Sequence, residues 1–415
     1  MTAQIQSSGV YVFFLGLPVG QVRYFGKGTS FVYAPEFVQT QIELSPLRMP
    51  LAYEPYLRAD AQFNNLPGIL ADSLPDTYGT RLMKAYFKSR GLSAPGPLES
   101  LAYVGDNGLG ALTFKPELNA GGAKMNDAIE LFKLIEAHRM QQEDGRFNLR
   151  ELVRKSGTAG GAQPKALLSH DRLANTLFIS NAPERESVLV KFQTDPDDEE
   201  PRVEHSLMQL AAQCGVSAAE TYLFTTPSPL GNLTHLAVKR FDLNRQLQRY
   251  HLASLAGLTE GQYPEGYADY AGFIKVTGAV TRDYTQKLEV FRRAMFNVLV
   301  NNHDDHDKNH AFLSNGREWW LSPAYDITYA EWSETAGRAM RVCGHDNHIT
   351  RADFQRLADE GELQSGDVSA VFEQMNSGIS KWTDVATVSG VSDVTIQRVA
   401  DTIQRNATLV FSKSR

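Results

Sequence analysis

One polar run, residues 300–310 (VNNHDDHDKNH), constrains this chain more than any other feature of its sequence. The run combines three histidines, three aspartates and three asparagines. Apolar segments flank it at 296–300 and 311–313, so the fold must hold both ends of the run in its core and bring the polar side chains to one place. An ordinary solvated loop needs no such composition, and the run is therefore a candidate active site.

Two residues of this run have the spacing of a phosphoryl-transfer site. Asp304 and Asn309 fit the pattern D-x-x-x-x-N, in which the aspartate accepts the proton of a substrate hydroxyl and the asparagine binds Mg²⁺. Asp326 follows a short predicted hairpin, 311–313 and 319–322, and adds a carboxylate as a second ligand. Oxygen ligands suit Mg²⁺, which also bridges phosphate groups. The first hypothesis is therefore phosphoryl transfer.

The histidines of the run support a second hypothesis, a His/Asp metal-dependent hydrolase. His303, His306 and His310 would then bind zinc, manganese or iron. Zinc hydrolases usually take further ligands from other helices, and the nearby sequence offers only His345 and His348. This hypothesis also leaves a glycine-rich turn and a lysine in an apolar strand unexplained, so the sequence favours phosphoryl transfer.

The glycine-rich turn covers residues 156–165 (SGTAGGAQPK), and its glycines would let backbone N–H groups approach phosphate oxygens closely. The lysine is Lys191, in the apolar segment 188–192 (VLVKF), where an ammonium group needs anionic partners. Nucleotide phosphates would satisfy it, and Glu204 on the next predicted helix could orient it. Taken alone, the glycine-rich segment is explained equally well as a tight surface turn, and Lys191 is explained better as an edge-strand lysine whose ammonium group reaches solvent.

The composition excludes several classes of protein. The chain has 415 residues, of which 41 are basic and 48 acidic, so its formal net charge is −7. That balance excludes a dedicated nucleic-acid coat protein or a polybasic membrane binder. No apolar run approaches the ~20 residues of a membrane span. The two cysteines form no CxxC or Cys/His pair, which excludes a disulfide scaffold or zinc finger. We expect a cytoplasmic protein without membrane association.

The predicted elements change in kind along the chain. Short strands are predicted first and helical spacing follows, at 10–15, 20–24 and 30–33 for the strands and at 64–90 and 127–140 for the helices. A second set of strands surrounds one helix, with strands at 165–169, 175–180, 187–192, 220–225 and 234–241 and the helix at 203–214. Beyond about residue 266 the pattern is mostly helical. We therefore divide the chain into three predicted domains, residues 1–118, 119–240 and 241–415.

Together, these motifs resemble those of the HipA-type serine/threonine kinases, the toxin halves of bacterial toxin–antitoxin modules. The N-terminal resemblance rests on residues 16–20, 31–36, 70–76 and 104–111. The rest of it lies in GAQPK at 161–165, VKF at 190–192, LAVKRFD at 236–242, DDHDKN at 304–309 and YD at 325–326. The resemblance implies an α+β, two-lobed protein-kinase-like fold with a small β-rich N-terminal subdomain and a mostly helical C-terminal lobe.

The resemblance also implies roles for individual residues. Asp304 would be the catalytic base, Asn309 and Asp326 would bind Mg²⁺, and Lys191 would contact the ATP phosphates. The remaining nucleotide contacts would be Lys239, Arg240 and Phe241 in the hinge beside adenine, Asp242 near the ribose, and Gly160, Gly161, Ala162, Gln163 and Lys165 over the nucleotide. His306 and Lys308 would touch phosphate or stabilise the catalytic loop.

The chain departs from the family pattern at two places. The family's inhibitory autophosphorylation site is a serine in the glycine-rich loop, and alignment places Thr158 there, with Ser156 two residues before it. In the catalytic loop, Asp305 stands where glycine is common and Asp307 where a small residue is common. We expect these extra carboxylates to alter the affinity for Mg²⁺.

The resemblance implies three kinds of partner. They are a HipB-like helix-turn-helix antitoxin, operator DNA bound through the antitoxin complex, and a protein substrate such as an aminoacyl-tRNA synthetase. A catalytically silent scaffold that binds the antitoxin or DNA is the other alternative, and the intact set Asp304, Asn309 and Asp326 argues against it.

Overall fold

The computed structural model describes most of the chain, namely residues 5, 8–118, 128–129, 164–178, 181–228, 231–261, 268–330 and 337–412. The chain divides into two compact units. Unit 1 comprises Met1–Pro196, Phe224–Ala253 and Leu313–Arg317, and unit 2 comprises Asp197–Leu223, Ser254–Phe312 and Glu318–Arg415. Each unit therefore combines segments that are distant in sequence.

Unit 1 begins with a five-stranded sheet in the order β4-β3-β2-β1-β5. Its strands are β1 (Val10–Phe14), β2 (Leu17–Phe25), β3 (Gly28–Tyr33), β4 (Tyr56–Arg58) and β5 (Leu112–Lys115). Neighbouring strands pair antiparallel, and Val12 on β1 lies opposite Phe114 on β5, both fully buried. Helices α2 (Pro35–Thr40) and α5 (Pro97–Val104) pack on this sheet. Alternating apolar residues thus give the sheet one face in the core.

The second sheet of unit 1 has six strands in the order β10-β11-β9-β7-β8-β6. They are β6 (Ala128–Ile129), β7 (Lys165–Asp171), β8 (Thr176–Phe178), β9 (Glu186–Lys191), β10 (Thr221–Ser228) and β11 (Gly231–Lys239). Strand β9 lies between β7 and β11 and pairs antiparallel with both. Its Val188 and Val190 are fully buried. A strand in the middle of a sheet is mostly apolar in sequence, as β9 is. Lys191 is the last residue of this strand.

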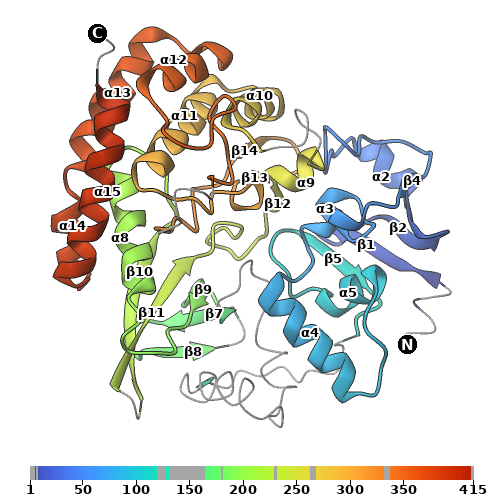
Figure 1. The fold of residues 1–415 in the computed structure, drawn as a ribbon. Helices are drawn as coiled ribbons and strands as arrows, with labels where there is room; N and C mark the ends of the chain where they lie inside the picture. The colour runs from blue at the N-terminus through green and yellow to red at the C-terminus, as the bar shows by residue number, and fades with distance from the viewer. Residues whose placement is uncertain are drawn as a thin grey trace. The chain divides into compact units, whose positions relative to one another are not determined.

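Unit 2 is mostly helical. Its helices are α8 (Glu200–Gln213), α9 (Leu255–Thr259), α10 (Tyr270–Thr281), α11 (Tyr284–Leu299), α12 (Arg351–Glu360), α13 (Ser365–Ile379), α14 (Trp382–Val388) and α15 (Asp393–Phe411). Helix α11 packs against α10, α12, α13 and α15, and its Phe291, Ala294 and Met295 are fully buried (Figure 1). Within the described residues, no helix has the length and apolar character needed to cross a membrane.

The structure confirms the α+β class, with a β-rich N-terminal part and a mostly helical C-terminal part. The strands predicted at 10–15, 165–169 and 187–192 correspond to β1, β7 and β9. The domain boundaries at 118 and 240 stay predictions.

Two helix predictions are wrong in part. The segment 64–90 contains two helices, α3 (Gly68–Ala71) and α4 (Thr77–Ser89), rather than one. Pro75 lies between them, and Asp76 caps α4 by accepting a hydrogen bond from the Gly79 N–H at 2.6 Å. At 127–140, residues 128–129 form strand β6, which pairs with β8, and the rest of that segment lies outside the described residues.

Candidate active site

The polar run leaves the C-terminal end of α11 and is anchored in the core at both ends. Val300, which ends the helix, is fully buried, and so are Ala311 and Phe312 where the chain enters β13 (Ala311–Ser314). Asn301 adopts the left-handed conformation, with φ of 58°, and turns the chain out of the helix. The structure thus confirms that core segments bracket the loop.

Asp304 and Asn309 lie together in this loop. The loop closes in the short 3-10 helix η2 (Asp307–Asn309), which brings the Asn309 side chain back to Asp304. Its Nδ2 donates a hydrogen bond to the Asp304 carbonyl at 2.9 Å. Because a carbonyl can accept only from the NH₂ group, this bond fixes the amide and leaves Oδ1 as the atom that could bind a cation. The Asp304 side chain is 60% exposed, so its carboxylate is accessible to a substrate.

The segment around Asp326 lies against the same loop. The Tyr325 hydroxyl donates to the Lys308 carbonyl at 2.9 Å, and Ala324 forms a parallel bridge with Ala218. Asp326 itself has φ of 57°. A left-handed backbone is uncommon for an aspartate and is often found at functional positions.

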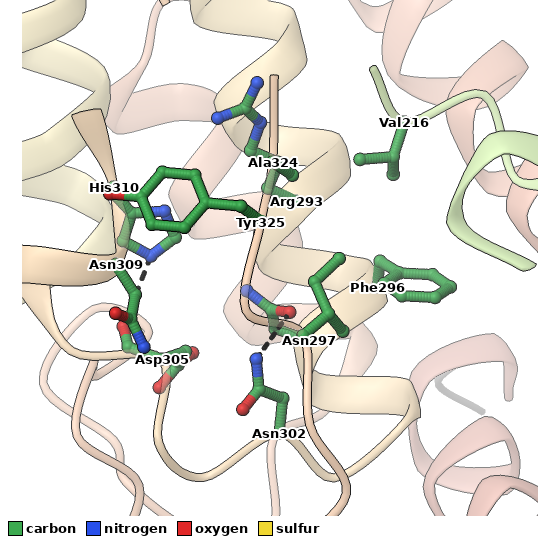
Figure 2. A pocket seen from close by; sticks show the side chains of 11 residues that line it. Val216, Arg293, Phe296, Asn297, Asn302, Asp305, Asn309, His310, Ala324 and Tyr325 are labelled. Carbon is green, nitrogen blue, oxygen red and sulfur yellow. Dashed lines mark hydrogen bonds between the residues drawn. The ribbon is translucent and has the colours of Figure 1, made fainter. Parts of the chain in front are cut away.

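A narrow polar pocket lies where these segments meet (Figure 2). Asn309, Tyr325 and Ile327 are among its lining residues, so the loop and the two neighbours of Asp326 share one space. Its volume of about 10 Å³ suits roughly one water molecule, so the pocket is not itself a nucleotide site.

Asp305, the neighbour of Asp304, is buried and points into the core of unit 2. Its exposure is 1%, and Oδ2 accepts a hydrogen bond from the Tyr270 hydroxyl at 2.7 Å. The Tyr270 hydroxyl accepts from Asn297, whose amide oxygen accepts from Asn302 at 3.2 Å, the contact drawn in Figure 2. Both carboxylate oxygens of Asp305 thus accept hydrogen bonds from the protein, and its effect on the affinity for Mg²⁺ stays a prediction.

Asp307, the other unexpected carboxylate, is partly buried. Burial raises the pKa of its carboxyl group, although the nearby His306 and Lys308 lower it. His306 lies 3.8 Å from the Asp304 carboxylate, and Lys308 is exposed on η2.

His310 is a core residue. Its Nε2 donates to the Asp305 carbonyl at 3.2 Å, and its ring lies 4.7 Å from that of Phe273. Burial lowers its pKa to about 4. Within the described residues, no three His, Cys, Asp or Glu side chains are grouped as a metal site would require. The geometry therefore does not favour the hydrolase hypothesis.

The two lysines of the candidate nucleotide site are paired within unit 1. Lys165 begins β7 and Lys191 ends β9, and the two are direct partners in the antiparallel register. Side chains of such partners share a face and lie about 5 Å apart at Cβ. Both residues are buried, with exposures of 4% and 6%, and Lys165 lies 3.8 Å from the Asp76 carboxylate. The two lysines thus present their cationic side chains on the same face of the sheet.

The segment predicted as the hinge follows β11 in unit 1. Lys239 is exposed, and Arg240 binds the Asp242 carboxylate through two hydrogen bonds of 2.9 and 2.6 Å. The second oxygen of Asp242 also accepts from the Gly110 N–H at 2.8 Å. Burial alone would raise the pKa of Asp242, but Arg240 holds it below its usual value. Asp242 thus ties the Gly110 turn to this segment and presents no exposed oxygen for a ribose.

The remaining predicted site residues lie outside the described residues. They are Ser156, Thr158, Gly160, Gly161, Ala162 and Gln163. Phe241 is half-buried beside Asp242, and Glu204 is buried on α8 in unit 2. Sequence reasoning missed Asp305 as a structural residue and Asp76 as the partner of Lys165, because in each case the partner is distant in the sequence.

Comparison with known proteins gave matches to two family models and likenesses to solved structures, two of which are described here. The HipA-like C-terminal domain matches residues 157–383, and the HipA N-terminal domain matches residues 10–115. Among solved structures the chain is similar to HipA of Shewanella oneidensis MR-1, solved with HipB and operator DNA. The identity is 18%, over 96% of this chain and 95% of that chain, with a TM-score of 0.67.

A weaker likeness, at 14% identity and a TM-score of 0.37, is to the Helicobacter pylori proinflammatory kinase CtkA. It covers 54% of this chain and 87% of that one, and we draw nothing from it. The comparison with curated proteins found no match. The likeness to the Shewanella protein shows a shared fold over nearly the whole of both chains.

Proposed function

We propose that this chain, which belongs to the HipA family, is an ATP- and Mg²⁺-dependent serine/threonine protein kinase and the toxin of a toxin–antitoxin module. The observation that carries the proposal is the closed loop of unit 2, in which Asn309 is bound to the Asp304 carbonyl while the Asp304 carboxylate stays exposed. A base and a cation ligand held five residues apart are what phosphoryl transfer requires.

Asp304 supplies the base in this proposal. Its exposed carboxylate accepts the proton of a serine or threonine hydroxyl while that oxygen forms a bond to the γ-phosphorus of ATP. The bond between this phosphorus and the bridging oxygen breaks, and ADP leaves. The loop contributes by holding the carboxylate in place, because both of its ends are fixed in the core.

Asn309 and Asp326 fit a magnesium site by their chemistry. The Asn309 amide presents its oxygen, and Asp326 adds a carboxylate, so both donors are the hard oxygen ligands that Mg²⁺ prefers. When bound there, Mg²⁺ would offset the negative charge of the phosphate groups. The segments of the two residues meet through the bond between Tyr325 and Lys308.

The paired lysines of unit 1 support nucleotide binding. Lys165 and Lys191 present two buried cationic side chains on one face of the sheet, which suits a polyanion such as the ATP phosphates. Asp76 near Lys165 partly balances that charge. The lysines and the loop together supply the two kinds of group that a kinase needs, a phosphate anchor and a proton acceptor.

The partners follow from the family. The Shewanella HipA structure contains HipB and operator DNA, and we propose a HipB-like helix-turn-helix antitoxin and operator DNA, bound through the antitoxin, for this chain too. The net charge of −7 suits an arrangement in which the partner supplies the basic DNA-binding surface. An aminoacyl-tRNA synthetase is the proposed class of protein substrate.

The test is transfer of labelled γ-phosphate from ATP in the presence of Mg²⁺ and host lysate, followed by identification of the labelled proteins. Asp304→Asn and Asp326→Asn should each reduce transfer by at least about a thousandfold, equivalent to ~4 kcal/mol of barrier. The matched control is Asp384→Asn, which changes an exposed aspartate on α14 and should leave transfer unchanged.

Circular dichroism of each variant would show that the fold is retained. Near-native transfer by both site variants would refute the assignment of the active site. A wild type that binds the antitoxin but labels no protein, itself included, would instead favour the catalytically silent scaffold.

A further inference from the structure

Residues 338–340, on the C-terminal side of the Asp326 segment, are bound to the catalytic loop by four hydrogen bonds, two from a side chain and two from the backbone. Arg338 Nη2 donates to the Asn302 carbonyl at 3.0 Å and to the Asp305 carboxylate at 3.2 Å. The Met340 N–H donates to the other Asp305 oxygen at 3.1 Å, and the Ala339 N–H donates to the His303 carbonyl at 3.0 Å. Three consecutive residues of one segment thus hold the loop immediately before and after Asp304.

The Asp305–Arg338 pair lies at the centre of these contacts and is fully removed from solvent. The side-chain exposures are 3% for Arg338 and 0% for Asp305. A buried ion pair is weak support for stability, because apolar groups of similar volume often stabilise as well or better. The pair is better explained by the geometry that it imposes on the residues beside it.

We propose that Asp305 is a positioning residue which, through Arg338, fixes the catalytic geometry of Asp304 and Asn309. This inference rests on the proposed kinase function. The physical link is the planar peptide unit between residues 304 and 305. That unit contains the Asp304 carbonyl, which accepts the hydrogen bond from Asn309. Holding Asp305 therefore holds the acceptor that orients the Asn309 amide.

The surroundings of Asp305 leave this peptide unit little freedom. The side chain of Asp305 is fixed by Tyr270, Arg338 and the Met340 N–H, and its own carbonyl accepts from His310 at 3.2 Å. A rotation of the loop at this point would break several buried hydrogen bonds at once. The state of residues 338–340 is therefore coupled to the orientation of the base and of the metal ligand.

The test compares Asp305→Asn with Asp353→Asn. Asp353 is a carboxylate of the same unit that accepts from the Thr350 N–H and hydroxyl and from His345, at 2.8, 2.7 and 2.6 Å, so it accepts as many hydrogen bonds as Asp305. Its side chain is 11% exposed, against 0% for Asp305, and these partners lie at 345 and 350, outside the loop 302–310. Two readouts are used: hydrogen exchange of the protein without nucleotide, and kcat with KM for ATP.

Asp305→Asn should speed exchange of the Ala339 and Met340 amides and of residues 302–310 by at least about tenfold. It should lower kcat by at least about tenfold and change KM for ATP by less than about threefold, since the phosphate-binding lysines are untouched. Asp353→Asn should leave both the exchange of the loop and kcat near wild type.

Arg338→Lys keeps a positive charge beside Asp305 and serves if Asp305→Asn does not fold. Both acceptors are bound by the single nitrogen Nη2. The ammonium group of lysine ends a shorter side chain and does not reach the position of Nη2 without a shift of the backbone, so intermediate changes in exchange and kcat are expected. Loop exchange and kcat that match those of Asp353→Asn in both variants would overturn the inference. A wild type without phosphoryl transfer would refute the proposed function instead, and the exchange comparison would still decide whether Asp305 holds the loop.

Discussion

His235 should make unit 1 lose stability in acid, and replacing it by asparagine should remove that response. The imidazole is fully buried on β11 between the rings of Phe192 and Phe224. Its Nδ1 accepts the Gln193 N–H at 3.0 Å, so the neutral ring carries its proton on Nε2, which lies 2.9 Å from the Thr226 hydroxyl. Protonating Nδ1 would set two donors against each other in the core.

The loss of stability in acid can be calculated from the pKa values of His235 in the folded and the unfolded protein. Burial lowers the pKa of His235 from 6.5 to about 3 in the folded protein. As the pH falls below about 6.5, the unfolded chain takes up a proton that the folded chain does not, so the free energy of unfolding decreases. The slope approaches ~1.4 kcal/mol per pH unit between pH 6.5 and about 3, and the loss from pH 7.5 to pH 5 is ~2 kcal/mol.

The assay is urea denaturation at pH 7.5, 6 and 5, followed by a deuterium pulse at one fixed pH and mass spectrometry of the β9 and β11 peptides. Asparagine places an oxygen near the position of Nδ1 and does not titrate, so His235→Asn should be less stable than wild type at pH 7.5. That deficit should shrink by ~2 kcal/mol at pH 5.

The other histidines are present in both proteins, so their contributions cancel in the comparison. His348→Asn, which removes an exposed imidazole, is the control and should leave the pH dependence as it is. A deficit that stays constant from pH 7.5 to pH 5 would refute the reasoning, because it would mean that the buried ring is protonated in the folded protein or does not titrate on unfolding.

Three further predictions concern the nucleotide and the ion pair of unit 1. Lys191→Ala should raise the Kd for ATP–Mg²⁺ by at least about tenfold. Lys191→Arg should not restore the affinity fully, because a planar guanidinium replaces a compact charge. Unchanged affinity in both variants, measured by calorimetry, would contradict the role of Lys191. The active protein should phosphorylate itself at Thr158 or Ser156, adding roughly −1.5 to −2 charges where ATP binds; mass spectrometry should find the phosphate in wild type and not in a base-deficient variant. Asp242→Asn should lower the free energy of unfolding of unit 1 by about 3–5 kcal/mol, since Arg240 would stay buried without its anion; a urea-denaturation loss below about 1 kcal/mol would argue against the buried pair.

The sequence predicts the active-site loop well because the signals there are local. Apolar segments on both sides of residues 300–310 are enough to expect a loop anchored in the core, and Val300 and Ala311 are indeed fully buried. The five-residue separation of Asp304 and Asn309 is likewise a local property, and η2 converts it into a hydrogen bond. Local spacing thus carries over directly into local geometry.

Contacts between distant residues could not be predicted in the same way. Sequence reasoning identified Lys165 and Lys191 separately, but their pairing depends on the register of β7 and β9, which one sequence does not specify. Asp305 looked like a third solvated carboxylate of the loop, because its partner Arg338 is 33 residues away in the sequence. The side-chain pattern is the same whether such a carboxylate faces solvent or an arginine in the core.

One failed prediction had its signal in the sequence. Helical spacing from 64 to 90 suggested a single helix, yet Pro75 and Asp76 stand in its middle. A proline disfavours helix at the residue before it, and an aspartate is a preferred cap, so together they mark the end of one helix and the start of another. The apolar periodicity continues because both α3 and α4 bury a face in the same core.

The left-handed backbone conformation of Asp326 places catalytic activity in conflict with thermal stability. A non-glycine residue with φ of 57° costs roughly 1–2 kcal/mol of conformational energy. Asparagine tolerates that conformation more readily than most residues. Asp326→Asn should therefore melt at a temperature equal to or slightly above that of wild type while it transfers no phosphate. A screen for thermal stability alone would therefore not detect the loss of this aspartate, whereas a screen for phosphoryl transfer would.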